Sequence, residues 1–91
     1  MSSNVAQEAR RRADNYRKAL QFLQGLRSFT YNDYTSSIKM AGIDMPESEM
    51  RSQWDMTKMM IGGPESLKQV QIESLRKGIE VFDEVARKLG G

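Results

Sequence analysis

The feature that most constrains this chain is the apolar pattern between residues 72 and 89. Apolar side chains recur there at alternating spacings of three and four, at Ile72, Leu75, Ile79, Phe82, Ala86 and Leu89. On a helix these positions form one continuous stripe, which is the seam of a coiled-coil-like packing. Nowhere do β-branched and polar residues alternate over the length of a strand. The sequence therefore predicts an all-α fold, a small bundle of three to four helices.

Capping residues and turn-forming residues divide the chain into four expected helices. Asn4 is a good N-cap for the first helix, and Thr30 with Asp33 has the spacing of a capping box at the second. Asp44 is the expected cap of the third helix, and the glycine–proline run at 62–64 ends it and starts the fourth. The expected helices are about 4–28, 31–41, 45–61 and 64–89, in a single domain of 91 residues.

The composition excludes several kinds of chemistry. The chain contains no cysteine and no histidine, which removes disulfides, thiol nucleophiles, imidazole acid–base catalysis and the usual zinc ligands. Tyr31, Tyr34 and Lys39 fall in one short helix, but no cofactor-binding loop accompanies them. We therefore expect a protein that is not an enzyme, with no catalytic residues, no cofactor and no metal.

The sequence gives no indication of a contact with a membrane. No apolar run approaches the roughly 20 residues that a membrane-spanning helix needs. The N-terminal residues carry charge with no apolar segment behind it. A chain without cysteine also fits a reducing compartment. We therefore expect a cytoplasmic protein with no membrane partner.

Methionine is concentrated in the third expected helix. Five of the seven methionines lie between Met45 and Met60, around the only tryptophan, Trp54. On a continuous helix, Met50, Trp54 and Ile61 share one face, and the opposite side carries Met45, Met56, Met59 and Met60. Methionine is a routine core filler, but it is also frequent on surfaces that adapt to partners. Because a small domain cannot easily bury two opposed faces, we favour a partner-binding surface.

The last expected helix carries a second, weaker stripe. It contains Leu67, Val70, Val81 and Val85, with Ser74 and Gly78 along it. A glycine inside a helix often marks the close approach of another helix. The neighbour is either another helix of the same bundle or a second subunit, and the pattern leaves both alternatives open. The hypothesis of a homodimer assigns the intersubunit contact to Val70, Gly78, Val81 and Val85.

Positive charge is concentrated in the first expected helix, although the formal net charge is only +2. Residues 1–30 hold six Lys and Arg residues against Glu8 and Asp14. Two cationic rows lie on the solvent side: Arg10 with Arg17, and Arg11 with Lys18. Asp14 lies between the rows and would compensate much of their charge. The pattern therefore favours a salt-bridged solvent face and leaves a phosphate or nucleic-acid contact as the alternative.

These observations define two functional hypotheses. The first is a non-enzymatic interaction module or small regulator that binds a protein partner through its apolar, methionine-rich helical surface. In size, methionine content and lack of catalytic residues, the chain is similar in type to small accessory regulators of phages and mobile elements, which act by stoichiometric binding. The alternative is a dimeric nucleic-acid-binding regulator that uses the basic N-terminal helix. Salt dependence separates the two, because phosphate contacts weaken steeply as salt rises.

Overall fold

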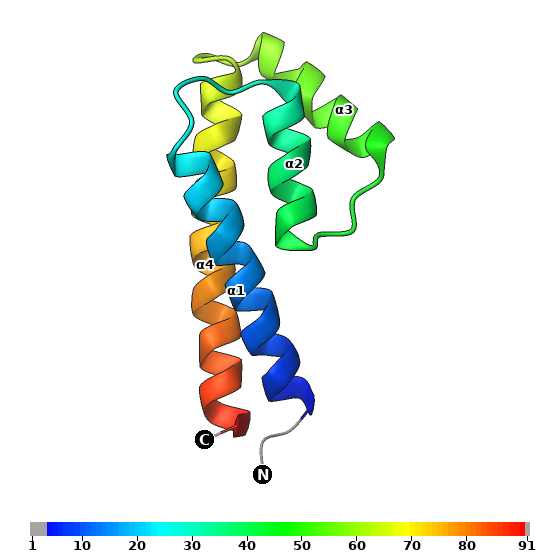
Figure 1. The fold of residues 1–91 in the computed structure, drawn as a ribbon. Helices are drawn as coiled ribbons and strands as arrows, with labels where there is room; N and C mark the ends of the chain where they lie inside the picture. Colours follow the sequence, from blue (N-terminus) through cyan, green and yellow to red (C-terminus); the bar gives the residue numbers. More distant parts are fainter. Residues whose placement is uncertain (1–3, 91) are drawn as a thin grey trace.

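The computed structural model of the chain describes residues 4–90 (Figure 1). These residues form four α-helices and one short 3-10 helix, and they contain no strand. The elements are α1 (Asn4–Gln24), α2 (Tyr31–Ala41), α3 (Glu47–Met56), the 3-10 helix η1 (Thr57–Met59) and α4 (Pro64–Gly90). The expected all-helical bundle is confirmed for this part of the chain.

The two long helices, α1 and α4, run antiparallel side by side (Figure 1). Small side chains on α1 permit their close approach, because Ala6, Ala9 and Ala13 are all buried. Larger side chains of α4 fill the remaining space, among them Ile72 and Leu75. The first half of the apolar stripe predicted for the last helix therefore faces α1 and the core.

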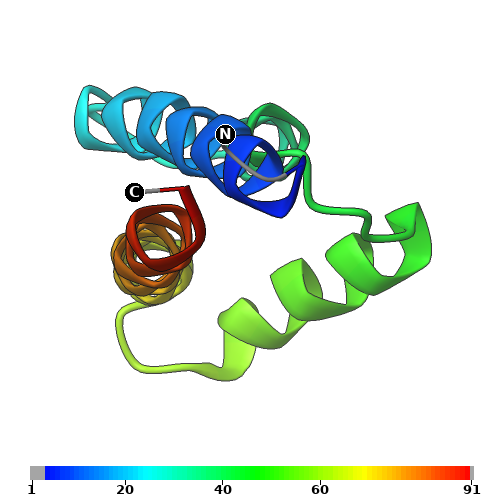
Figure 2. The same ribbon diagram turned by 90° about the horizontal axis from the view of Figure 1, so that it is seen from below.

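The other two helices cover only one end of this helix pair, as the two views in Figures 1 and 2 show. A side chain at Gly42, just after α2, would lie close to the Asn15 amide, so α2 ends level with the middle of α1. Beyond that level α1 and α4 continue alone, and we call this half of the molecule the stalk (residues 4–14 and 80–90). The molecule is accordingly elongated, with extents of 49 × 24 × 17 Å.

The core lies at the covered end, where α1, α2, α3 and α4 meet. Leu23, Ile38 and Leu75 are almost completely enclosed there, and so is the whole of Tyr34. The ends of α2 follow the predicted signals. The Thr30 side chain and the Asp33 carboxylate each accept a hydrogen bond from the other residue's backbone N–H, which completes the capping box.

Two further helix boundaries agree with the sequence. Gly42 ends α2 with a φ of 74°, in the left-handed region that glycine adopts without steric cost. Pro64 occupies the first position of α4, where its missing N–H is not needed. Each of these two boundaries rests on a residue whose backbone preference is independent of its neighbours, which is why the sequence predicted them.

The first helix differs from its prediction at both ends. It ends at Gln24 instead of residue 28: the Gly25 amide still bonds to the Gln21 carbonyl, and the chain then turns. Asn4 already lies inside the helix, so the N-cap position falls outside the described residues. Val5, near the start of the helix, is exposed, whereas the next residue, Ala6, is completely buried.

The third expected helix is divided into two shorter elements. The α-helix spans Glu47–Met56, and its cap position is held by Pro46 in an extended conformation, not by Asp44. Past the helix, the Thr57 hydroxyl donates to the Trp54 carbonyl oxygen, 2.6 Å away. From Thr57 the chain tightens into η1.

Ile61 shows the consequence of that break. A helix continuing to residue 61 would have placed Ile61 on the same face as Met50 and Trp54. The chain instead leaves η1 in an extended conformation and passes Gly62 with a φ of 90°, so Ile61 is 99% exposed. Met50 is buried and Trp54 is half-buried, so those two predicted members of the inner face are confirmed.

Lys68 joins the chain after α1 to α4. Its side chain is only 11% exposed, and its ammonium nitrogen Nζ donates to the Leu26 carbonyl oxygen at 3.1 Å. The carboxylate of Glu65 lies 3.9 Å from the same nitrogen. The turn after α1 therefore has a backbone acceptor satisfied by a charged donor, which is a stronger bond than one between neutral groups.

Candidate protein-interaction surface

An aromatic cluster holds α3 against the rest of the molecule. The Trp54 ring has its centroid 5.7 Å from that of Phe29, 5.8 Å from that of Tyr31 and 6.2 Å from that of Tyr34. Aromatic pairs at such distances contribute about 0.5–1.5 kcal/mol each beyond the effect of burial. Because the other three rings come from α2 and the residues just before it, the cluster sets the orientation of α3 relative to α2.

Polar contacts of two tyrosines then set the position of α3 along α2. The Tyr34 hydroxyl donates to Oε1 of Gln53 at 2.7 Å, and the Tyr31 hydroxyl donates to Oε1 of Glu47 at 2.8 Å. The Arg51 guanidinium lies over the Tyr31 ring, 3.9 Å from its centroid. These contacts occupy one side of α3 from its first turn to its last.

Both tyrosines keep their donor protons at neutral pH. Burial is the main cause that raises the pKa of Tyr34, followed by the carboxylate of Glu49. Desolvation also raises the pKa of Tyr31, and its hydrogen bond to Glu47 adds to the effect. The two hydrogen bonds between α2 and α3 are therefore maintained over the whole physiological pH range.

The last residue of α3 and the segment after it carry large apolar side chains that are exposed. Met56 is 62% exposed and Met59 is 90% exposed, while Met60 is also on the surface. Ile61 follows directly. We call this set the methionine surface: Met56, Met59, Met60 and Ile61. Single exposed apolar residues are ordinary, but a contiguous group of large ones is a feature of binding sites.

A groove of about 320 Å³ adjoins the methionine surface, between α3 and α4. Its walls are Gln53, Met56, Met60, Leu67 and Val70. Four apolar side chains and one amide surround it, a composition typical of sites that accept an apolar group and orient it by a single polar contact. Sequence reasoning placed neither Gln53 nor Leu67 at a binding surface. The feature that could have indicated this groove is that the second stripe of the last helix starts beside the end of α3.

Met45 was expected with the other three methionines but lies apart from them. Its half-buried side chain packs on the core, and its sulfur lies 3.9 Å from the Tyr34 hydroxyl. Met45 precedes the first turn of α3, so the helical projection that grouped it with Met56 does not apply. Met45 is therefore half-buried against the core and does not share the exposed surface of Met56, Met59 and Met60.

Gly78 was expected at a dimer contact, and the structure places a side chain of the same chain against it. A Cβ atom at position 78 would come within 2.4 Å of Cε2 of Tyr16 in the same chain. The close approach of another helix is therefore intramolecular. The other three residues of the expected contact are at least partly accessible, since Val70 and Val81 are exposed and Val85 is half-buried.

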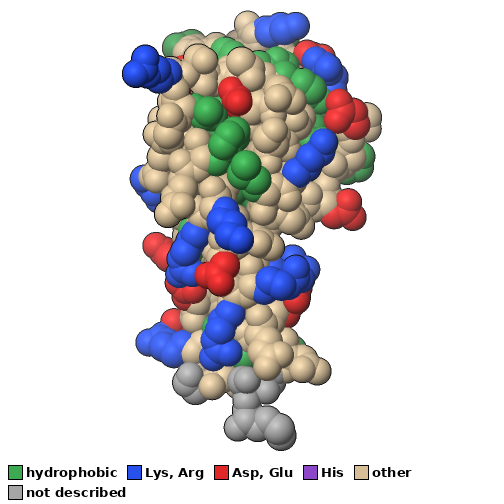
Figure 3. Space-filling model, viewed as in Figure 1, with side chains coloured by type: hydrophobic (Ala, Val, Ile, Leu, Met, Phe, Trp, Pro, Cys, Tyr) green, Lys and Arg blue, Asp and Glu red, His purple; other side chains and the backbone are tan. Residues whose placement is uncertain are grey.

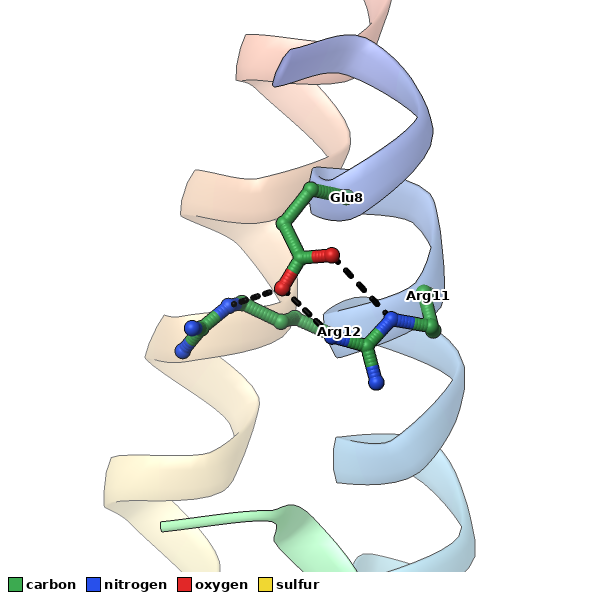
Figure 4. A network of polar contacts seen from close by, with 3 residues as sticks. All are labelled: Glu8, Arg11 and Arg12. Atoms are coloured by element: carbon green, nitrogen blue, oxygen red, sulfur yellow. Dashed lines mark hydrogen bonds and ion pairs between the residues drawn. The ribbon is translucent and has the colours of Figure 1, made fainter. Parts of the chain in front are cut away.

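The basic face of α1 is largely compensated by ion pairs at its N-terminal end. Arg11 donates to both carboxylate oxygens of Glu8, and the Arg12 Nε donates to Oε1 of the same residue at 3.0 Å (Figure 4). The Arg11 hydrogen bond is the main cause that lowers the pKa of Glu8, and the Arg12 hydrogen bond adds to it. Glu8, which the sequence reasoning did not use, is therefore the centre of this network.

The remaining cations of α1 divide into two kinds. Arg17 pairs with Asp14 at 3.3 Å and reaches across to Asp83 of α4. Arg10 and Lys18 make no ion pair within residues 4–90, and both are exposed. Positive and negative side chains are interspersed over the stalk in the space-filling view (Figure 3). The expected compensation by Asp14 is thus confirmed for Arg17 alone.

Residues 4–90 contain no group of three or more acidic side chains placed to hold a metal ion. None of the helices described is both long enough and apolar enough to cross a bilayer. No protein-family model, curated protein or solved structure matches the chain.

Proposed function

We propose that this chain is a non-enzymatic interaction module that binds a protein partner through the methionine surface and the adjoining groove. The observation that carries the proposal is the exposure of Met59 and Ile61, 90% and 99%, beside an apolar groove. Long unbranched side chains adapt to the shape of a partner at little cost. In this proposal the chain acts as a small cytoplasmic regulator by occupying its partner, in the manner of phage and mobile-element accessory proteins.

The methionine surface has four large apolar side chains that can drive binding. Burying one methionine or isoleucine side chain contributes about 1.5–3 kcal/mol, so the four together contribute about 6–12 kcal/mol. A micromolar dissociation constant corresponds to about 8 kcal/mol that remains after the costs of association are overcome. These side chains therefore supply a large share of the free energy that micromolar binding needs, and contacts in the groove add to it.

The test is the double variant Met56→Gln with Met60→Gln. Both side chains are at the surface, so glutamine should leave the melting temperature within a few degrees of the parent value. Proteins captured by the tagged parent chain from its native host, and identified by mass spectrometry, should be lost from the double variant. Since the contact is apolar, capture should persist in high salt.

A matched control is Met40→Gln, because Met40 is exposed on α2, away from the groove. It should retain every captured partner. If the double variant melts at a much lower temperature, the methionines belong to the core and the proposed surface is wrong. Identical capture by the parent and the double variant would equally remove the proposal.

We further propose that the chain acts as a homodimer through the outward side of α4. Exposed Val81 and half-buried Val85 support this, because they lie on the half of α4 that α2 and α3 do not reach. Val70 is exposed as well and also lines the groove. Light scattering should give twice the chain mass of 10.4 kDa at micromolar concentration. A monomeric mass at high concentration would exclude the dimer.

A second candidate function is nucleic-acid binding by the basic face of α1, through Arg10, Arg11, Arg17 and Lys18. The observation that favours it is that Arg10 and Lys18 are exposed without an ion pair among the described residues. Binding to duplex DNA or RNA should then fall steeply with salt. The double variant Arg10→Gln with Lys18→Gln should weaken binding uniformly across sequences and flatten the salt dependence. Binding unaffected by salt would exclude this role.

A further inference from the structure

The outward side of α4 carries a short seam that continues into the stalk. Ser74, Gly78, Val81 and Val85 recur at spacings of four, three and four, as residues at the contact line of two paired helices do. Ser74 and Val81 are exposed, and Tyr16 covers Gly78 from one side. We call these four residues the α4 seam.

The second half of this seam, Val81 and Val85, lies in the stalk. Figure 1 shows α1 and α4 alone at the lower end of the molecule, where α2 and α3 do not reach. Apolar side chains therefore remain accessible there: Val81 is 58% exposed, and Leu89, farther along α4, is 51% exposed. Two antiparallel helices cover one stripe on each other, and a second pair of helices is the usual way to cover the rest.

Four charged residues follow the seam along one side of α4. In order they are Glu73, Lys77, Glu84 and Lys88, so their signs alternate from negative to positive. The inner pair, Lys77 and Glu84, and the outer pair, Glu73 and Lys88, have the same midpoint, between Glu80 and Val81. If a second α4 is aligned antiparallel to the first about that midpoint, each of these charged residues lies opposite a residue of the opposite charge.

A parallel pairing would do the reverse, since each residue would then face its own equivalent and like charges would meet. Ion pairs within the chain leave part of this row of charges unpaired. Glu84 pairs with Lys88 at 3.3 Å and with Arg87, and Glu73 pairs with Arg76 at 2.9 Å. Lys77 makes no ion pair within residues 4–90. Exposed pairs of this kind add little affinity but select one orientation over another.

We propose that the partner of the α4 seam is a second copy of this chain, bound antiparallel about the point between Glu80 and Val81. Val81 then lies beside the two-fold axis, Ser74 lies near Val85 of the second copy, and Lys77 lies opposite Glu84 of the second copy. Residues 80–90 of each copy then run beside residues 71–81 of the other copy's α4, so the α1 and α4 helices of both copies form a four-helix arrangement around the axis. This inference rests on the proposed homodimer and specifies its orientation.

The antiparallel orientation gives the dimer two separate binding ends. Val70, at the edge of the groove, lies about ten residues from the axis, so the two grooves are roughly 30 Å apart along the helix direction. The methionine surfaces therefore point to opposite ends of the dimer. A partner that presents two sites would bind the second one intramolecularly, which raises its overall affinity.

Because the chain contains no cysteine, single cysteine variants can test this arrangement directly. In the antiparallel dimer Ser74→Cys of one copy faces Val85→Cys of the other. An equimolar mixture of the two variants should yield a covalent dimer on mild oxidation. Neither variant alone should do so, because equivalent positions lie roughly 15–20 Å apart along the axis, beyond the reach of a disulfide.

The outcomes separate the orientation from the dimer itself. A dimeric mass with no mixed disulfide, or with Ser74→Cys cross-linking to itself, would overturn the antiparallel orientation and leave the homodimer standing. A monomeric mass at high concentration would overturn both. Loss of partner capture by the methionine variants has no bearing on this result, because neither Met56 nor Met60 belongs to the α4 seam.

A charge exchange provides a second measurement. Lys77→Glu puts like charges together at two places in the dimer, and we expect its dissociation constant to rise several-fold, up to roughly tenfold. Adding Glu84→Lys to that variant should restore the parent value. Circular dichroism of both proteins at equal concentration checks that α4 remains helical. Failure of the second change to restore dimerisation would contradict the antiparallel arrangement.

Discussion

The ring of Tyr16 lies against Gly78, so closely that a Cβ atom at position 78 would meet Cε2 at 2.4 Å. The same ring packs edge-on against Phe82, with the two centroids 5.2 Å apart. These contacts lie at the level where α2 ends and the stalk begins. Tyr16 therefore couples α1 to α4 at the point where the molecule changes from four helices to two.

We expect Gly78→Leu to destabilise the single chain. The added side chain must displace the Tyr16 ring, and overpacking of this kind costs about 1–3 kcal/mol. For a chain of this size that corresponds to a melting temperature lower by roughly 4–8 °C per kcal/mol. Differential scanning calorimetry at low protein concentration measures the effect without the dimer.

The control for that experiment is Glu80→Leu, at an exposed position of the same helix, which should change the melting temperature much less. Gly78→Ala is informative too. Alanine stabilises a helix by roughly 1 kcal/mol relative to glycine, and this gain offsets the cost of its contact with Tyr16. The net change in the free energy of unfolding should therefore be small. A Gly78→Leu variant as stable as the parent would show that Tyr16 moves aside freely.

Trp54→Ala should release α3 before it unfolds the rest of the chain. Truncating a packed tryptophan costs about 3–5 kcal/mol when it is fully buried, and the half-buried Trp54 belongs at the lower end of that range. The lost contacts are those that hold α3 to α2. Hydrogen exchange should accelerate over residues 47–59, while the pairing of α1 with α4 stays protected. Uniform loss of protection in all helices would contradict this assignment.

Alkaline pH should weaken the attachment of α3 to α2. The pKa values of Tyr31 and Tyr34 are raised above the ordinary 10.0, since the folded state favours the neutral hydroxyl. Their contribution to stability is therefore fully present below pH 10 and is lost as pH rises through the folded pKa values. Near-ultraviolet absorbance should show Tyr34 ionising after free tyrosine does. Tyr34→Phe should remove that late transition.

Acid should loosen the start of α1 through Glu8. Its pKa is lowered below 4.5, chiefly by the hydrogen bond from Arg11, so the carboxylate favours the folded state above pH 4.5. That contribution disappears as pH falls through the folded pKa. Carboxyl titration by NMR should place the Glu8 midpoint below 4.5, and Arg11→Gln should move it upward. An unchanged midpoint in that variant would contradict the network.

Local sequence signals predicted the features that depend on a few adjacent residues. The capping box of Thr30 and Asp33 and the left-handed Gly42 are of this kind, because cap geometry needs only one turn of chain. Helix type and order follow from the same signals together with the spacing of apolar residues. These signals do not predict which element packs against each stripe, because periodicity identifies a buried face without identifying what covers it.

The differences at Met45, Ile61 and Gly78 have this common origin. Met45 and Ile61 were placed by projecting one uninterrupted helix through residues 45–61, whereas α3 begins at Glu47 and ends at Met56. Gly78 was correctly identified as a point of close approach, but its neighbour, Tyr16, lies 62 positions earlier in the sequence. No local pattern connects two residues so far apart.

The pairing of α1 with α4 also determines the order in which this chain acquires its shape. Residues 4–24 find their main neighbour in residues 64–90, which a ribosome makes last among the described helices. Contacts between distant segments form only after the loop between them is closed, and this slows folding. In a nascent chain the alanine face of α1 therefore stays open to solvent and to chaperones until the C-terminal helix emerges.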